Sequence, residues 1–152
     1  MRKITIYLGL LESKLGRPIP RFEAQLTSQA ARAIAEAAAA EAERQNVRMS
    51  IAVVDDGGYL LYFVRMSETV APASAEVAVA KARSAALFKR ATLSWEEAAK
   101  DRAVIMKIPN VVPLGGGVPL IVDGAGVGAI GVSGATSTKD DEIARAGANL
   151  IG

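Results

Sequence analysis

Apolar residues recur at every third or fourth position between residues 27 and 46. One face of a helix with these bounds collects Ala31, Ile34, Ala35, Ala38 and Ala42, and most charged residues of the segment lie elsewhere. This spacing predicts an amphipathic helix. Because its apolar face consists mostly of methyl groups, each buried side chain contributes little, and the helix must lie close to its neighbour.

A β-hairpin is predicted for residues 49–66. Two runs rich in β-branched and aromatic residues flank Asp56-Gly57, a pair that tolerates the positive φ angles of a tight turn. Alternation along the second run places one set of side chains on a common face: Tyr59, Leu61, Phe63 and Arg65.

The remaining pattern predicts three helices and at least two strands. Pro72 can open a helix that ends near Arg90, and a capping box at residues 94–97 opens a shorter helix to about Met106. Strands at 118–122 and 126–133 flank the turn Asp123-Gly124, and a last helix, capped by Ser137 or Thr138, covers 139–151. Strands joined by tight turns pair antiparallel, so the order of elements predicts an α+β domain rather than a doubly wound fold.

Residues 1–25 are interpreted as an N-terminal arm ahead of a single domain at 26–152. Alternating apolar residues at positions 4–8 resemble a short strand, and a disordered leader is the alternative. The apolar run at the start is short and lacks a cleavage pattern, and no run approaches the length of a membrane span. We therefore expect a cytoplasmic protein without a membrane segment.

Composition excludes several kinds of chemistry. The chain has no cysteine and no histidine, so disulfides, Cys or His zinc sites, Ser-His-Asp triads and histidine-ligated haem cannot form, and no metal site is predicted. Eighteen Lys and Arg against sixteen Asp and Glu leave a net charge of +2, and aromatic residues are few. Binding to nucleic acid is therefore not expected.

Two glycine-rich segments invite functional interpretation. Residues 126–131 match a dinucleotide-binding GxGxxG pattern, but they lie inside a predicted strand, where glycines more often mark a close approach of backbone. Gly115, Gly116 and Gly117 form a loop whose N–H groups could hold a carboxylate or other anion. A tight connection alone would also use glycine, and both interpretations stay open.

Two charged residues are candidates for chemistry, each with a structural alternative. Lys81 lies in line with Val77 and Phe88, so its stem can pack on the core while its ammonium group reaches water. Asp55 could act as a general base or metal ligand, but a contact within its own turn is the simpler role.

The combined motifs resemble those of the GlcG/HbpS-like family, which includes the C-terminal domain of PduO-type proteins. The resemblance covers about residues 26–152 and rests on six segments in the same order: AVVDDGG at 52–58, FVRM at 63–66, AKARSA at 80–85, PLGGGVP at 113–119, GAIGVSG at 128–134 and DDE at 140–142.

The resemblance implies an α+β fold with a five-stranded antiparallel sheet, similar to profilin or PAS domains. It also implies homo-oligomers from dimers to octamers, haem or another tetrapyrrole as a ligand of some members, and a place beside catabolic pathways. The frequent alanines and glycines independently favour packing between subunits, because small side chains allow close approach.

The sequence departs from the family pattern in two places. Ser67-Glu68-Thr69 stands where the family usually has an Asp-Gly-Ala turn, and histidine is absent. The iron of any bound haem would therefore need Met66, a tyrosine such as Tyr62, a hydroxyl group or a lysine.

Three functions remain open on the sequence. The favoured one is an accessory protein that binds an anionic organic ligand, either a tetrapyrrole or a small carboxylate. Its predicted ligand contacts are Arg65, Met66, Lys81, Gly115, Gly116 and Gly117. The second is an enzyme acting on a small carboxylated catabolic intermediate, with Lys81 or Asp55 as the acid or base. The third is a structural oligomer without a ligand.

Overall fold

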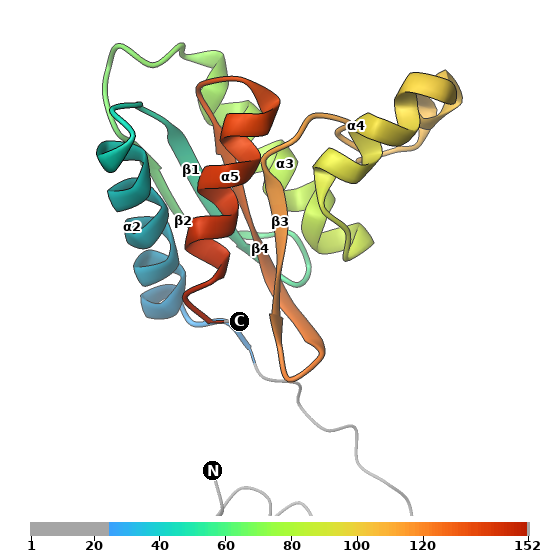
Figure 1. Ribbon diagram of the computed structural model, residues 1–152. Coiled ribbons are helices and arrows are strands. Elements are labelled where there is room, and N and C mark those ends of the chain that lie inside the picture. The colour runs from blue at the N-terminus through green and yellow to red at the C-terminus, as the bar shows by residue number, and fades with distance from the viewer. Residues whose placement is uncertain (1–24, 152) are drawn as a thin grey trace, which may run out of the picture.

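Four antiparallel strands form the centre of the fold, and helices cover both faces of the sheet (Figure 1). The computed structural model describes residues 25–151. The elements in chain order are α2 (Ser28–Arg44), β1 (Ser50–Asp55), β2 (Leu60–Arg65), α3 (Ala73–Phe88), α4 (Thr92–Asp101), the short 3₁₀ helix η1 (Ala103–Lys107), β3 (Gly117–Val122), β4 (Ala125–Ser133) and α5 (Ser137–Ala148). The α+β class is confirmed, and the predicted arm at 1–25 lies almost wholly outside the described residues.

The strand order in the sheet is β2-β1-β4-β3. Ala52 of β1 pairs with both Phe63 of β2 and Gly131 of β4, and Gly117 of β3 pairs with Gly131. The expectation of five strands is wrong for residues 25–151. The chain between η1 and β3 carries two prolines and two glycines, which disfavour a strand, and it forms a loop.

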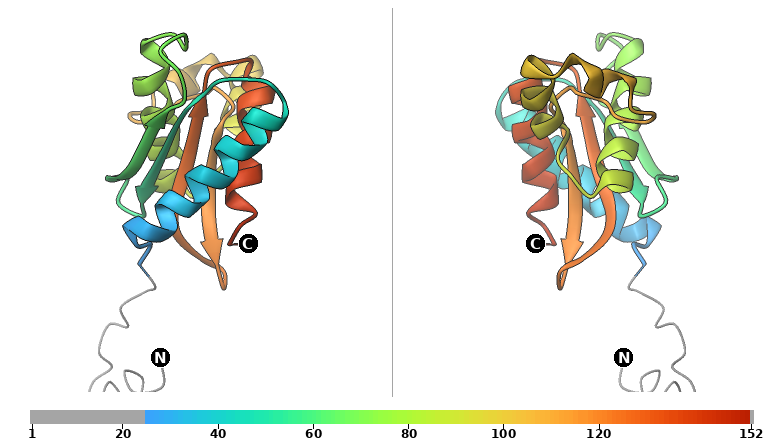
Figure 2. Two further views of the ribbon diagram at one scale, coloured as in Figure 1. Left: turned by 90° about the vertical axis from the view of Figure 1, so that its left-hand side faces the viewer. Right: turned by 90° about the vertical axis from the view of Figure 1, so that its right-hand side faces the viewer.

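The two faces of the sheet have different cores. Helices α2 and α5 cover one face and α3 the other, as the side views show (Figure 2). The α2/α5 side holds the larger side chains, such as Ile34, Ile51 and Ile143. The five residues predicted for the apolar face of α2 are all buried, which confirms that prediction. On the α3 side the core is mostly alanine.

Helix α3 lies directly on β4 at Gly131. A Cβ atom at this position would clash with the carbonyl oxygen of Ala78 and lie 2.5 Å from the backbone nitrogen of Ala82. The glycines of 126–131 therefore belong to a strand that other backbone approaches closely, as predicted, and they do not open a helix.

The hairpin between β1 and β2 differs from the prediction in its turn. Gly58, with φ of 81°, takes the positive angle that was assigned to Asp56-Gly57. Its N–H donates to the Asp55 carbonyl at 3.0 Å, and the Asp55 N–H donates to the carbonyl of Tyr59 at 2.9 Å. The turn is thus one residue longer than a two-residue hairpin loop.

A bulge in β2 follows from this longer turn. The register shifts between Val53 and Val54, which face Tyr62 and Leu60. As a result Leu61 packs in the α2/α5 core and Leu60 lies on the α3 side with Phe63. Strict alternation, which grouped Leu61 with Phe63, is wrong here because a bulge changes the facing of the residues before it.

Two predicted helix starts also need correction. Helix α4 begins at Thr92, two residues early, and the hydroxyl of Ser94 donates to the Ala91 carbonyl instead of capping the helix. Helix α5 is capped by Thr136, whose hydroxyl accepts from the Lys139 N–H, rather than by Ser137 or Thr138. None of the helices within 25–151 is long and apolar enough to cross a membrane.

Candidate functional site

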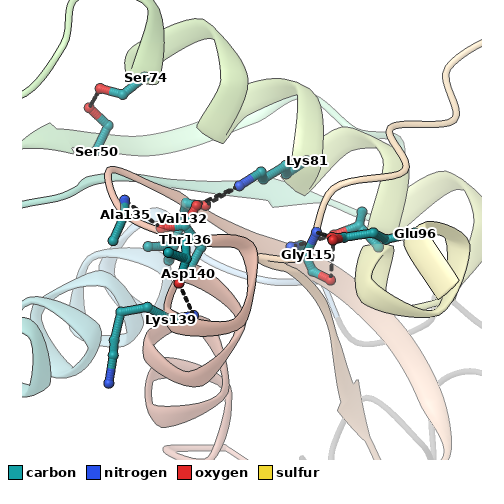
Figure 3. A network of polar contacts seen from close by, with 12 residues as sticks. Ser50, Ser74, Lys81, Glu96, Gly115, Val132, Ala135, Thr136, Lys139 and Asp140 are labelled. Atoms are coloured by element: carbon teal, nitrogen blue, oxygen red, sulfur yellow. Dashed lines mark hydrogen bonds and ion pairs between the residues drawn. The ribbon is translucent and has the colours of Figure 1, made fainter.

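Lys81 and Asp140 form a buried ion pair between α3 and α5 (Figure 3). The Lys81 ammonium group donates to Asp140 Oδ2 at 2.7 Å and to the carbonyl oxygen of Val132 at 3.1 Å. Lys81 is only 2% exposed, so the expectation that its ammonium group reaches water is wrong. Close packing of α3 on β4 directs the side chain inward, where Asp140 compensates its charge.

Asp140 lies in the first turn of α5, where the helix dipole favours a negative charge. In the structure it is buried, and its second oxygen, Oδ1, accepts the N–H of Ala135 at 2.9 Å. The sequence carries a signal for this burial. Asp140 precedes Ile143 and Ala144 by three and four positions, so it shares the apolar face of the helix.

Two of the three glycine N–H groups in the loop are used within the protein. Gly115 donates to Glu96 Oε2 at 2.6 Å, and Gly117 donates to the Thr92 hydroxyl at 2.7 Å. Both acceptors come from α4, so a side-chain carboxylate already lies where an external anion was predicted. Sequence reasoning missed Glu96 because the capping box explained its charge.

The structure brings Lys81 and the glycine loop together. Gly116 has φ of 122°, and a Cβ atom there would lie 3.1 Å from Lys81 Nζ and 2.5 Å from the carbonyl oxygen of Val132. Glycine is therefore required both for the backbone angle and for the space beside the ammonium group. The polar groups of this cluster thus bond to one another within the protein, and they connect α3, α4 and α5 at the end of β4.

Arg65 ends β2 and holds the segment that follows it. Its guanidinium group donates to the carbonyl oxygen of Glu68 at 3.0 Å and to that of Val70. The hydrogen bonds found for Arg65 thus stabilise residues 67–70, the segment in which the sequence departs from the family pattern. They do not link Arg65 to Lys81.

Met66 and Asp55 lie apart from the other predicted site residues. Met66 packs against the core on the α2/α5 side of the sheet, whereas Lys81 lies on the α3 side. Asp55 Oδ1 accepts the Tyr59 N–H at 2.9 Å, which confirms the predicted contact within the turn.

An apolar groove of about 460 Å³ runs between β2 and α3. Its lining consists of Leu60, Phe63, Ala75, Glu76, Val79, Ala80 and Arg83. Two of these residues are charged, and both are exposed at the protein surface: Glu76 and Arg83. The groove therefore offers an apolar wall with one anionic and one cationic group within reach.

A sequence model of the haem-degrading HbpS-like proteins matches residues 26–149. The chain belongs to the HbpS-like family. Among characterised sequences it is similar to protein GlcG of Escherichia coli K12, with 45% identity over 109 residues that make up 71% of this chain and 81% of GlcG.

Solved structures of HbpS-like proteins share the fold. A double mutant of HbpS from Streptomyces reticuli superposes with a TM-score of 0.79 and 34% identity, covering 86% of this chain and 89% of that one. A complex of PduOC with haem gives a TM-score of 0.75 and 26% identity, covering 84% and 96%.

The residues predicted as ligand contacts thus occupy three places in this HbpS-like fold. Lys81 and Gly115–Gly117 belong to the polar network at the end of β4, Arg65 to the segment after β2, and Met66 to the α2/α5 core. The groove itself was missed from the sequence. Its one signal in the sequence was the spacing of Val79, a half-buried apolar residue that shares one side of α3 with Glu76 and Arg83.

Proposed function

We propose that this protein binds a flat, largely apolar small molecule that carries a carboxylate, a tetrapyrrole above all, in the groove between β2 and α3. The observation that carries the proposal is the groove itself, with apolar walls and an exposed arginine at its edge. Membership of the HbpS-like family and similarity to a haem complex of PduOC support the choice of a tetrapyrrole.

The groove residues suit such a ligand. Phe63 and Val79 would contact the face of a ring, and the small side chains of Ala75 and Ala80 leave room for its edge. The guanidinium group of Arg83 can donate two parallel hydrogen bonds to a carboxylate. Small-molecule sites typically combine apolar walls with a few polar groups that fix the orientation of the ligand. The apolar lining and Arg83 would supply these two parts.

The haem iron fits this groove less well than the organic ring does. Of the lining residues only Glu76 has lone pairs that could ligate a metal, and the others are apolar or cationic. Tyr62 and Met66, which the sequence suggested as iron ligands, pack on the opposite side of the sheet. The ring and carboxylate of haem thus fit the residues present, while a nitrogen or sulfur ligand is missing from the lining.

Arg65 remains our predicted second cationic contact. It lies two residues beyond Phe63 on β2 and faces the same side of the sheet, near the start of α3. The alternative function, an enzyme using Lys81 or Asp55, has less support, because Lys81 is held in the buried pair with Asp140 and Asp55 accepts the N–H of Tyr59 in its own turn.

Titration with haemin, followed by absorbance, tests the proposal. Replacement of Arg83 by alanine should weaken binding by about 10- to 100-fold, because a hydrogen bond to a charged group is lost. Val79→Asp should abolish binding by placing a carboxylate on the apolar wall. Arg48→Ala, which removes an exposed arginine on another part of the chain, is the matched control. Unchanged affinity in both groove variants would refute the site.

We further propose that the chain associates with copies of itself. Exposed apolar side chains gather in and after η1: Val104, Met106, Ile108 and Leu114. A surface of this kind, away from the groove, suits a contact between subunits.

A further inference from the structure

We infer that the groove recognises a tetrapyrrole by its ring and carboxylate and not by its metal, so that metal-free porphyrin binds as tightly as haem. The inference rests on the proposed function. It concerns which part of the ligand the protein recognises. It follows from the positions of the candidate iron ligands among residues 25–151.

Among the described residues, no histidine, cysteine or methionine lines the groove. Histidine and cysteine are absent from the whole sequence. Within 25–151, Met49, Met66 and Tyr62 belong to the α2/α5 core, and Met106 lies in η1 outside the groove lining. The sheet separates the three core residues from a ligand lying against α3, so none of them can ligate its metal without disruption of the fold.

Lys81 is excluded for a different reason. It belongs to α3 but does not line the groove, and its ammonium group is held by the Asp140 carboxylate and the Val132 carbonyl oxygen. To bind iron, Lys81 would have to lose a proton and leave the Asp140 carboxylate buried without its cation, which is strongly unfavourable.

Two side chains near the groove carry an oxygen atom that could ligate iron. Glu76 lines it and is exposed, and Tyr59, 69% exposed, precedes the lining residue Leu60. Both side chains are exposed, and no hydrogen bond among residues 25–151 holds either one over the groove. Their contribution to binding is therefore small in our inference, and each can be removed without disturbing the core.

The remaining lining groups act on the organic part of the ligand alone. Leu60, Phe63, Val79 and the two alanines offer apolar contact, and Arg83 offers a charge-assisted hydrogen bond. Haemin and protoporphyrin IX present the same ring edge and the same propionates to these groups. Their affinities should consequently be nearly equal.

The test compares haemin with metal-free protoporphyrin IX on the full chain. We expect dissociation constants that agree within about threefold, and an absorbance spectrum of the haemin complex without low-spin features. Arg83→Ala should weaken both ligands by the same factor. Glu76→Gln and Tyr59→Phe should change the affinity for both ligands equally, or not at all.

The outcomes separate the inference from the proposed function. Haemin binding more than about tenfold tighter than protoporphyrin IX overturns the inference alone, as does a selective loss of haemin binding in Glu76→Gln or Tyr59→Phe. Failure of both porphyrins to bind, or binding that ignores Arg83→Ala and Val79→Asp, overturns the proposed function and the inference with it. A circular dichroism spectrum of each variant shows that it is folded.

Discussion

Lys81 and Asp140 connect helices on opposite faces of the sheet through a pair of charges that are each only 3% exposed. Removal of two ions from water is costly, and their attraction offsets that cost only where further hydrogen bonds complete the site. Val132 and Ala135 supply those bonds through a carbonyl oxygen and an N–H group. The pair thus fixes how α3 and α5 meet at the end of β4.

The ion pair gives a prediction for stability. Lys81→Met should lower the free energy of unfolding by about 3–5 kcal/mol, because it leaves the Asp140 carboxylate buried without its cation. The double variant Lys81→Met/Asp140→Asn keeps an oxygen for the Ala135 N–H and removes the charge, so it should recover most of the loss. Urea denaturation of the two variants measures this difference. Equal stability of the single variant and the wild type would contradict it.

Glu41 provides a second prediction at this scale, for pH dependence. Hydrogen bonds from the side chains of Arg44 and Gln45 lower the pKa of the Glu41 carboxyl to about 2. A pKa that is lower in the folded state stabilises the protein above the ordinary value of 4.5, and the contribution disappears as the pH falls towards 2. Gln45→Ala should raise the pKa of Glu41, as measured by NMR titration.

The control for that titration is Glu36→Gln, which changes a carboxylate on the same helix that pairs with Arg32. It should leave the pKa of Glu41 unchanged, because no hydrogen bond joins the two residues. A pKa of Glu41 near its ordinary value in the wild type would show that these hydrogen bonds do not form in solution.

Residue types and spacings predicted only part of the candidate site. Lys81 and Gly116 were both predicted as ligand contacts, and they do lie side by side, yet the burial of Lys81 depends on Asp140, which is 59 residues away in sequence. The contact of Glu96 with Gly115 is likewise a tertiary one. A single sequence contains no distance information of that kind, so charge compensation in the core was not foreseeable in detail.

At the scale of elements, α3 and β4 pack so closely that glycine is required between them. A Cβ atom on Gly131 would meet backbone atoms of Ala78 and Ala82, which cannot rotate away as a flexible side chain could. The alanine-rich core on this side of the sheet follows from the same approach. Small residues on both elements thus replace the interlocking of large side chains.

This packing predicts the effect of adding a single methyl group. Gly131→Ala should destabilise the fold by about 1–3 kcal/mol or more, because α3 must shift to admit the Cβ atom. The matched control is Gly126→Ala in the same strand, where the nearest atoms to an added Cβ are 3.7 Å away on the Lys89 side chain. Thermal unfolding of both variants should show a large decrease in Tm for the first only. Similar decreases would argue against the close approach.

Elements with a strong period were predicted well, and irregular joints were not. The buried face of α2 came directly from its three- and four-residue spacing. The turn at Gly58 and the bulge opposite Val53 were missed, because several loop geometries suit the residues Asp-Asp-Gly-Gly. One inserted residue then reversed the facing of Leu61, which illustrates how a local turn controls which side chains a groove receives.

At the scale of the whole molecule, the two faces of the sheet are packed differently. The α2/α5 side holds the large apolar core, and the α3 side leaves the groove against the edge strand β2. Helix α4 and η1 extend away from the sheet on the other side of α3 (Figure 1). The groove takes no residue from this projecting segment, so the ligand and the second subunit that we propose do not compete for the same residues.

The projecting segment carries our last prediction, which is that the protein forms a dimer or larger particle. Val104 is 59% and Met106 64% exposed. Several apolar side chains that are exposed to this degree in one segment usually mark an interface. A contact between identical chains with two-fold symmetry would bury the patch on both subunits at once. Light scattering at micromolar concentration should therefore report more than one chain per particle.

A charge in this patch should shift the equilibrium towards smaller particles. Met106→Glu places a carboxylate in the predicted contact, where it would have to be buried without a partner, so we expect the weight-average mass to fall. Leu150→Glu alters another exposed apolar residue, 54% exposed near the end of α5, and should leave the mass unchanged. If the wild type is a monodisperse monomer, or if both variants dissociate alike, the interface does not lie at η1. Haemin affinity should be the same in wild type and Met106→Glu, because the groove lies on β2 and α3 and takes no residue from this segment.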